Sequence, residues 1–442
     1  MKRILLILCI ILPTKAIYGQ EVLQDSIPTK KNLFTVDASL KTRGEIRHGG
    51  LPPTSGDQDK SPKTAAFVST RTTLSVGYER EWLSAKITAE HSGTWGDVSS
   101  SIFSVYEAWA QLRSRQGLFA KIGRQDLSYD DERIFGNDDW AMSGLSHDAI
   151  KLGYEGFGHK LHLIGSFNQN LKNINGGFYY KDGLQPYKNL QALWYHYDIP
   201  GTKLGASLLF TNMGVQGGKE GEPDEATYYQ QLVGTHLNWA PKNALVEGSF
   251  YYQMGREQHG LPIRAWMASI KGTYTPIPSL DLYTGYDYLS GDPYFAIPPE
   301  GSLGVIRHEV ARGFSSLYGS HHKFYGAMDF FYVTTYVNGF SPGLQNAFAG
   351  CKYRPVKGLS LEGSYHFYAT SSQLIDIKPP LGHELQCKLS YTFLKCVSLS
   401  AGYSFMQGTE TMERLKRSTE NRRLHWGWLM LKITPRFFQG RW

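Results

Sequence analysis

The sequence lacks a long hydrophobic run beyond its first residues. After the N-terminal leader, no stretch of about 20 apolar residues occurs among the 442, which excludes a protein that crosses a membrane with helices. Charged residues make up only 19%, and the composition is not that of a collagen or a coiled coil. The chain is instead rich in glycine (47) and tyrosine (28), with 14% aromatic and 41% hydrophobic residues. This composition fits either a large soluble β protein or an outer-membrane barrel, whose strands are apolar on one face only.

Cysteine is scarce as well. Outside the leader, only Cys351, Cys387 and Cys396 remain, an odd number in separate segments without metal-ligand spacing. We expect three isolated thiols that behave as small apolar residues. The motifs G-x-S-x-G and H-E-x-x-H are absent, and the adjacent His321 and His322 are typical of a solvated loop. The sequence therefore predicts no enzyme, no metal site and no cofactor.

The one apolar run is at the N-terminus. Lys2 and Arg3 precede about ten apolar residues, and small and polar residues follow up to Gly19. This is the order of regions in a secretory signal peptide. We expect residues 1–19 to be removed, which lowers the formal charge from +7 to about +4. So weak a charge does not indicate a nucleic-acid partner.

Alternation of apolar and polar residues is the main signal in the rest of the chain. Residues 32–47, for example, place Phe34 and Val36 on one face and Asp37 and Lys41 on the other, and a helical period fits them badly. The eighteen segments that alternate in this way are 32–47, 66–78, 82–91, 102–114, 117–125, 147–155, 159–168, 189–198, 203–212, 228–240, 244–254, 264–275, 279–289, 345–355, 358–370, 382–394, 397–408 and 422–435. We interpret them as β-strands.

The connections between these strands alternate strictly in length. Each even-numbered strand but the last is followed by about two to four residues, and each odd-numbered one by about 9 to 21, with one exception of about 55 at 290–344. A membrane barrel requires tight periplasmic turns and longer outer loops, whereas a soluble sandwich has no reason to sort its loops. Residues 323–337 alternate in part, so a hidden hairpin could raise the strand count.

The apolar faces carry aromatic residues toward their ends, as at Tyr391, Phe393, Tyr403 and Phe405. Such girdles lie where a barrel crosses the lipid interface. The aromatic C-terminus at Trp442 suits the signal that the barrel assembly machinery commonly recognises. We therefore predict an all-β, transmembrane antiparallel barrel of about eighteen strands in the outer membrane of a Gram-negative bacterium. Residues 20–442 form its single domain, in contact with outer-membrane lipid, and 290–344 its long loop.

The polar faces of these strands would line the lumen. The basic residues in phase are Lys41, Arg43, Arg47, Arg71, Lys86, Arg113, Lys121, Lys151, Lys271, Lys352 and Lys388, and the acidic ones are Asp37, Glu45, Glu90, Glu107, Asp281, Asp287, Glu362 and Glu384. A mildly basic lumen favours anionic solutes, which arginine pairs hold in a bidentate manner. Alternatively, the same charges form internal ion pairs that brace the wall.

One long stretch, 121–152 (KIGRQDLSYDDERIFGNDDWAMSGLSHDAIKL), resembles a segment of the alginate-export family of outer-membrane barrels. Residues 314–332 resemble that family's long loop, and Thr70-Arg71-Thr72 matches its early arginine. The resemblance implies an eighteen-stranded barrel whose arginine-rich constriction passes an anionic exopolysaccharide outward. It also implies roles for five residues in the solute path: Arg71, Arg124, Arg133, Asp139 and Asp148.

Two of these assignments leave alternatives open. Counting from Ala120 and Ile122 places Arg124 on the apolar face, unless a bulge at Gly123 or a position above the bilayer intervenes. The loop that holds Arg133 and Asp139 is long enough to fold into the mouth and narrow it, or to form a salt bridge that never contacts solute.

The sequence thus predicts a passive channel for an anionic oligosaccharide or polysaccharide, or for other small anionic solutes. The expected path is lined by Arg43, Arg47, Arg71, Lys86, Glu107, Arg113, Lys121, Arg124, Arg133, Asp139, Asp148, Lys151 and Asp287. Periplasmic polysaccharide-export proteins are its expected partners. The alternative is a plugged barrel with a structural or adhesive role, whose long loop fills the lumen.

Overall fold

The fold is a single closed antiparallel sheet. The structure is a computed structural model that describes residues 32–49, 64–169, 184–218, 225–292, 309–331, 341–374, 378–416 and 422–442. The predicted signal peptide lies outside the described residues, as does most of the central part of the long loop. The hidden hairpin expected at 323–337 does not form over 323–331, and the remainder of that stretch lies outside the described residues.

The strands match the predicted segments closely. The first nine are β1 (Leu33–His48), β2 (Thr64–Glu79), β3 (Leu83–Thr94), β4 (Asp97–Arg113), β5 (Leu118–Gln125), β6 (His147–Gly156), β7 (His159–Phe167), β8 (Asn189–Ile199) and β9 (Leu204–Gly217). The others are β10 (Ala226–Trp239), β11 (Ala244–Arg256), β12 (Pro262–Ile277), β13 (Leu280–Leu289), β14 (Leu344–Tyr353), β15 (Leu359–Ala369), β16 (Pro380–Leu394), β17 (Val397–Gly408), β18 (Arg423–Ile433) and β19 (Arg436–Arg441). Two short helices, η2 (His321–Lys323) and α1 (Glu410–Lys416), complete the described elements.

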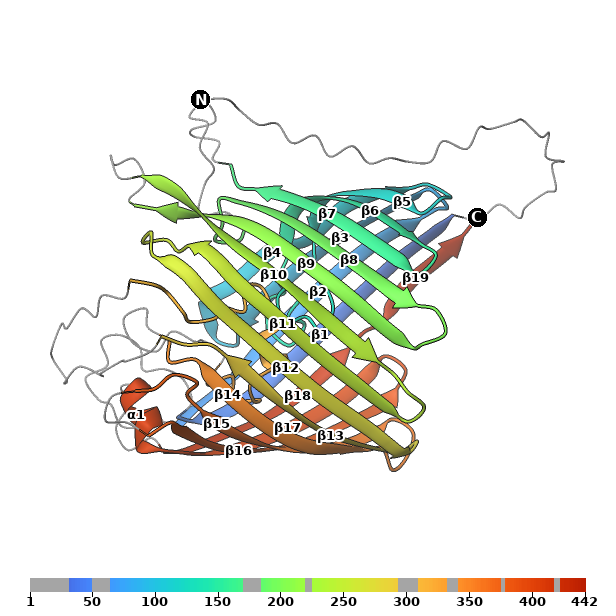
Figure 1. The fold of residues 1–442 in the computed structure, drawn as a ribbon. Coiled ribbons are helices and arrows are strands. Elements are labelled where there is room, and N and C mark those ends of the chain that lie inside the picture. The colour runs from blue at the N-terminus through green and yellow to red at the C-terminus, as the bar shows by residue number, and fades with distance from the viewer. Residues whose placement is uncertain are drawn as a thin grey trace, which may run out of the picture.

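From β1 to β18 each strand pairs with the next strand in the chain, and the barrel closes where β18 and β19 pair with β1 (Figure 1). The predicted eighteenth strand ends at Pro435, but the chain continues beyond it as β19. Because Pro435 has no N–H, the ladder is interrupted there, and the pairing with β1 shifts register between Val36 and Asp37. β18 and β19 together therefore form the last of eighteen barrel strands, which confirms the predicted fold.

The wall has two faces, as the alternation predicts. On β16, the Leu385 and Leu389 side chains are exposed on the outer surface. The Glu384 side chain lies on the other face of the strand and is buried inside the barrel. A bulge in β4 opposite Thr88 and Ala89 directs both Tyr106 and Glu107 inward. No helix among the described residues is long and apolar enough to cross a membrane.

The order of short and long connections also follows the prediction, with two exceptions. The connection of β11 to β12, residues 257–261, is no longer than the short connection 354–358 between β14 and β15. β3 and β4 are joined by Trp95 and Gly96 alone, where the sequence predicted a loop of 92–101. The serine-rich start of β4 has no apolar alternation, so its strand conformation was not visible in the pattern. β4 consequently has 17 residues, more than twice the 8 of β5 beside it.

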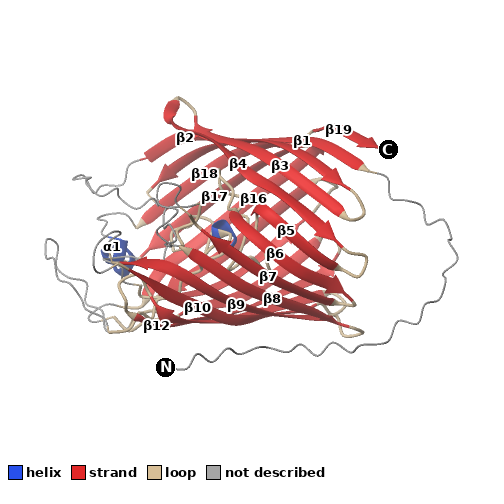
Figure 2. Ribbon diagram, turned by 90° about the horizontal axis from the view of Figure 1, so that it is seen from above, coloured by secondary structure: helices blue, strands red, loops and turns tan. Residues whose placement is uncertain are grey.

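The lumen is occupied by two loop segments. Figure 2 shows loops and a short helix enclosed by the strands. They are residues 126–146, between β5 and β6, and residues 309–331, which include η2. Phe135 of the first segment lies beside Tyr318 of the second in an isolated β-bridge, and both rings are buried. The main hydrophobic core of the described residues is thus formed by loops against the inner wall.

Candidate functional site: a lumen narrowed by two inner loops

Arg133 joins the two inner loops to the wall. Its Nε lies 3.0 Å from Asp131 Oδ2 and its Nη2 lies 3.1 Å from Asp287 Oδ1 on β13, while Nη1 donates a hydrogen bond of 3.1 Å to the Tyr325 hydroxyl. The guanidinium also lies 4.1 Å from the centre of the Phe324 ring. Burial alone would raise the pKa of Asp131, but the Arg133 charge holds it below its ordinary value. One cation thus joins two carboxylates at the centre of a buried layer.

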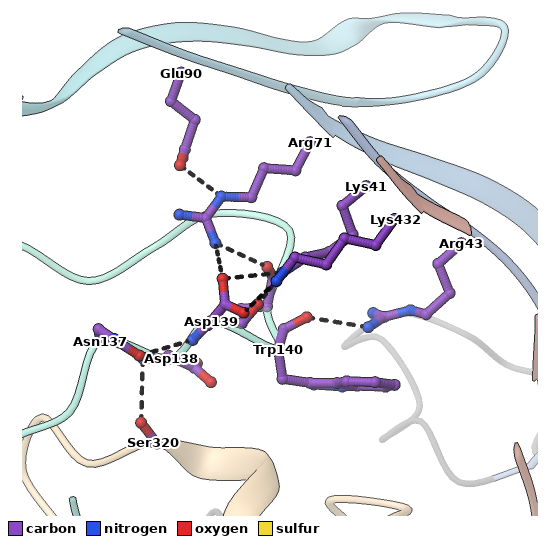
Figure 3. Close-up of polar contacts among 11 residues, drawn as sticks. Lys41, Arg43, Arg71, Glu90, Asn137, Asp138, Asp139, Trp140, Ser320 and Lys432 are labelled. Atoms are coloured by element: carbon purple, nitrogen blue, oxygen red, sulfur yellow. Dashed lines mark hydrogen bonds and ion pairs between the residues drawn. The ribbon is translucent and has the colours of Figure 1, made fainter. Parts of the chain in front are cut away.

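A second attachment point is Asp139, at the far end of the same loop (Figure 3). Its carboxylate lies 3.3 Å from Lys41 of β1, 3.2 Å from Lys432 of β18 and 3.6 Å from Arg71 of β2. The Lys41 ammonium also donates to the Asp139 carbonyl, and Arg43 donates to the Trp140 carbonyl at 3.1 Å. Burial would raise the pKa of Asp139, but the Lys41 and Lys432 charges hold it below its ordinary value. The basic wall formed by β1, β2 and β18 therefore binds the loop.

Trp140 closes this attachment. Its ring stacks on His322 of η2, with the centres 4.0 Å apart and the planes 9° from parallel, and the Arg43 guanidinium covers it at 4.3 Å. Trp426 and Trp428 of β18 approach it edge-on. Both ring faces are occupied, so the loop is fixed against the wall and against the other loop.

Most of the predicted path residues are paired inside the wall. Glu45 accepts Arg43 at 2.7 Å and Arg47 at 3.0 Å, and Glu90 accepts Arg71 at 2.6 Å. Lys86 lies 2.5 Å from Glu107, and Arg113 lies 3.1 Å from Glu155. These pairs, within β1 or between strands, neutralise the cations locally, as in the bracing interpretation of the lumen charges.

Two predicted path residues have no ion pair with any described carboxylate. Lys121 and Lys151 are directly opposite one another on β5 and β6, and both ammonium groups rest against aromatic rings, at 3.9 Å from Trp109 and 5.7 Å from Tyr129. Lys121 is nevertheless buried beneath the first inner loop. The Lys121 ammonium group is therefore part of the lumen wall and is not in contact with open water.

Arg124 and Asp148 do not line the lumen, which corrects their predicted place in the solute path. They oppose one another on β5 and β6 and form a bidentate pair at 2.8 and 2.9 Å. No register shift occurs at Gly123, so both side chains share the outer face with the exposed Ile122 and Ile150. Simple alternation was therefore right and the role implied by the resemblance was not.

Two hollows flank the Arg133 layer. On the extracellular side, a cavity of about 440 Å³ is bounded by β9 to β12 and by residues 311–317, and its lining includes Gln230 and Gln253. On the periplasmic side, an inner chamber of about 750 Å³ extends from the layer toward the short turns, where it reaches Asp281, Lys352 and Arg354. Fully buried Tyr251, Met267, Phe314 and Tyr325 lie between them.

Two lysines of the inner chamber are unpaired among the described residues. Arg354 is paired with Asp281, and Lys352 lies 3.9 Å from Glu362, but neither Lys271 nor Lys388 has a described carboxylate within ion-pair distance. Lys271 lies only near the Tyr283 ring, at 5.6 Å. These two ammonium groups are the basic side chains of the chamber lining that have no ion pair among the described residues, as Asp138 is among its acidic ones. Alternation alone placed them in the lumen, but it could not show which lumen cations lack partners.

Glu384, which alternation placed among the acidic residues of the lumen, fixes the second inner loop, and the sequence missed this contact. Its buried carboxylate accepts hydrogen bonds from the Met328 backbone N–H at 3.0 Å and from the Tyr368 hydroxyl at 2.9 Å. Lys432 was missed as well, although it is in phase with the inward-facing Trp428 and Met430 of β18. Among the described residues, no three histidine, cysteine, aspartate or glutamate side chains are grouped to hold a metal ion.

The attachment of the first loop is expected to tighten as the pH falls. Burial and the neighbouring Asp329 charge raise the pKa of Asp138 to about 6, from an ordinary 3.8. Because the folded loop then binds a proton that the free loop has lost, its packing gains stability as the pH falls through about 6. Hydrogen exchange of amides 137–145 should be slower at pH 5 than at pH 7, after correction for intrinsic rates. The isosteric Asp138→Asn variant should lose most of this difference, and an unchanged difference would contradict the assignment.

Comparison with known proteins gives the fold a context. No protein-family model matches the sequence, and no curated protein sequence matches it. Solved structures do. OccK2 (OpdF) of Pseudomonas aeruginosa has a TM-score of 0.61 at 12% identity, covering 92% of this chain and 98% of that one. OccAB1 of Acinetobacter baumannii has a TM-score of 0.60 at 11% identity, and the match covers 92% of this chain and 97% of that one. A BenF-like porin of Pseudomonas fluorescens has a TM-score of 0.58 at 13% identity, and the match covers 91% of this chain and 99% of that one. The chain has the barrel fold of outer-membrane porins.

This result bears on the resemblance drawn from the sequence. The predicted eighteen-stranded barrel and its outer-membrane setting are confirmed by these structures and by the exposed apolar outer wall. Membership of the alginate-export family is not confirmed, because no family model matches and the structures compared above carry other names.

Proposed function

We propose that the protein is an outer-membrane channel for small anionic solutes, short anionic oligosaccharides included. The observation that supports this most directly is the inner chamber, where neither Lys271 nor Lys388 has a described carboxylate within ion-pair distance and Lys271 has only the Tyr283 ring beside it, at 5.6 Å. Paired charges brace a wall, whereas unpaired charges set the potential that a permeating ion meets.

The size of the solute follows from the inner loops. Residues 126–146 and 309–331 cross the lumen and meet at the Arg133 layer, so a solute passes only where these loops leave space or move. A polysaccharide chain needs a continuous opening along the whole axis of the barrel. Outward passage of a polysaccharide, and dependence on periplasmic polysaccharide-export proteins, therefore stay predictions that rest on the sequence resemblance.

The anion preference is expected to depend on the two unpaired lysines. In planar bilayers with a salt gradient, the Lys271→Gln/Lys388→Gln double variant should lower the anion-to-cation permeability ratio about threefold or more, because two unit charges leave the wall of a narrow lumen. The reversal potential measures this ratio directly. Lys242→Gln is the matched control, since Lys242 lies exposed in the turn between β10 and β11, outside the chamber. A wild-type pore that prefers cations would contradict the proposal.

The alternative function, a plugged barrel with a structural or adhesive role, is favoured by one observation. The buried layer around Arg133 fills the space between the two hollows with side chains that are nearly inaccessible to water. The same bilayer recordings separate the two functions. A stably inserted wild-type protein without conductance would support the plug, whereas resolved anion-selective steps would support the channel.

A further inference from the structure

An apolar groove lies in the outer wall of β9 to β12, near the periplasmic turns. It has a volume of about 490 Å³, and its lining includes Leu204, Leu237, Trp239, Val246 and Ile270. Leu237, Trp239 and Ile270 are 45%, 48% and 58% exposed on the outer face. In a barrel, this face and this height meet the hydrocarbon of the membrane, so the groove receives an apolar group.

Glycine forms the floor of the groove. Gly248 of β11 lies between Leu237 and Ile270, its direct partners in the ladders with β10 and β12. Apart from its chain neighbours, a Cβ added at Gly248 would meet only the Ser269 carbonyl, at 3.6 Å. A Cβ added at Gly272, on the same face, would meet nothing within 4 Å. The side chains of the wall therefore leave the space above the floor open.

Two lysines lie at the periplasmic end of the groove, in adjacent turns. Lys203 directly precedes Leu204, and Lys242 follows Trp239 in the next short turn. The Ala240 N–H donates a 3.0 Å hydrogen bond to the Lys203 carbonyl, so the two turns are in contact. Both lysines are exposed, and no described carboxylate lies within ion-pair distance of either. Residues 200–203 and 240–243 contain no aspartate or glutamate, so this end of the groove is positively charged.

The Glu247 carboxylate belongs to the other face of the wall. Glu247 borders the groove, but its neighbours Val246 and Gly248 face outward, so its side chain faces the lumen. It opposes Lys271 in the ladder with β12. The two turn lysines therefore keep their charge on the outer side.

The backbone at Lys203 suits another residue better. Its φ is 56°, in the left-handed region, and Gly201 in the same turn has a φ of 78°. Glycine or asparagine adopts this conformation at lower cost than lysine. The lysine is thus unfavourable for the turn itself, which points to a role for its side chain.

A phospholipid with an anionic headgroup matches these features. Its acyl chain is apolar and fits the groove, and its phosphate accepts hydrogen bonds from ammonium groups. Lysines close to a membrane surface attract anionic lipids, and a tryptophan such as Trp239 commonly lies at the lipid interface. A second copy of the chain fits poorly, because a two-fold pair joined through this groove would bring the lysines of both copies together.

We propose that the groove between β9 and β12 binds one anionic phospholipid of the periplasmic leaflet. An acyl chain lies on Gly248, and the headgroup lies at Lys203 and Lys242. The site is on the outer wall and neither lysine lines the inner chamber, so the inference is independent of the solute that the lumen carries.

The test measures lipid binding to the purified full-length barrel in detergent by native mass spectrometry. The wild type should bind dioleoylphosphatidylglycerol about fivefold or more tightly than zwitterionic dioleoylphosphatidylethanolamine. The Lys203→Asn/Lys242→Gln double variant should lose this preference, and it should fold, since asparagine suits the left-handed backbone at position 203. Lys395→Gln is the matched control, because it removes an exposed turn lysine between β16 and β17, far from the groove in the chain.

A second variant tests the groove itself. Gly248→Phe fills the floor and should weaken the binding of both lipids about threefold or more, because the acyl chain loses its place. If this variant does not fold, Gly272→Leu replaces it. Glycerol 3-phosphate, which has the phosphate but no acyl chain, should not displace the bound lipid.

Several outcomes would overturn the proposal. Equal affinity of the wild type for the two lipids, or a preference that survives in the double lysine variant, would each do so. Unchanged lipid binding after the groove is filled would also count against it, as would displacement by glycerol 3-phosphate. A wild-type dimer that Gly248→Phe dissociates would assign the groove to a second copy of the chain instead.

Discussion

Replacing Arg133 with alanine is expected to release the two inner loops and open the pore. The change leaves Asp131 and Asp287 buried without the cation between them, and it removes the hydrogen bond to Tyr325. Loss of one partner from a buried ion pair costs about 3–5 kcal/mol. Because each 1.4 kcal/mol changes an equilibrium tenfold, the population with detached loops should rise by about two to three orders of magnitude. Single-channel conductance in planar bilayers measures this opening.

The matched control for this prediction is Arg113→Ala, which removes another arginine of the lumen wall. Its pair with Glu155 is largely exposed, and exposed pairs contribute about 0–1 kcal/mol. This variant should conduct like the wild type. The Arg133→Lys variant keeps the positive charge, and its conductance should lie between those of the Arg133→Ala and Arg113→Ala variants. If Arg133→Ala conducts like Arg113→Ala, the Arg133 layer does not close the lumen.

Placing a lysine on the outer wall is expected to destabilise the barrel strongly. Leu389 lies near the middle of β16 with its side chain exposed on the outer face. A lysine at the bilayer midplane costs about 2–4 kcal/mol, because its charge loses water without gaining a partner. The Leu389→Lys variant should therefore unfold from lipid vesicles at a lower denaturant concentration than the wild type.

The neighbouring position separates lipid contact from a general intolerance of lysine in this strand. Ser390 lies on the inner face of β16 and its side chain is uncharged. The Ser390→Lys variant should unfold close to the wild type, since its ammonium group reaches water in the lumen. Equal destabilisation by the two lysines would mean that the assignment of the two faces is wrong.

The wall could be predicted from the sequence because its signal is local. Each strand alternates with a period of two, and each periplasmic turn is short, so the pattern of a few neighbouring residues determines the face of each side chain. The prediction failed where this local signal was absent. The serine-rich start of β4 does not alternate, and Pro435 ended the last strand in the pattern although the chain resumes pairing one residue later.

The lumen could be predicted only in part, because its contacts are distant in the sequence. Alternation placed Lys41 and Arg71 inside, but their common partner, Asp139, belongs to a loop and meets Lys432 across 293 residues. No periodicity reports such a contact. For the same reason the sequence could not distinguish Arg71, which pairs with Glu90 of the neighbouring strand, from Lys388, which has no described ion-pair partner.

The position of the inner chamber makes the two directions of transport unequal. The unpaired lysines lie on the periplasmic side of the Arg133 layer, so a solute from the periplasm meets them before it meets the closed layer. A solute from outside first meets the cavity above the layer, whose lining includes the carboxylates of Glu257 and Asp292, and reaches the lysines only after it has passed the layer. If the protein is the anion channel proposed above, an inbound anion therefore meets carboxylates before it meets the lysines, whereas an outbound anion meets the lysines first.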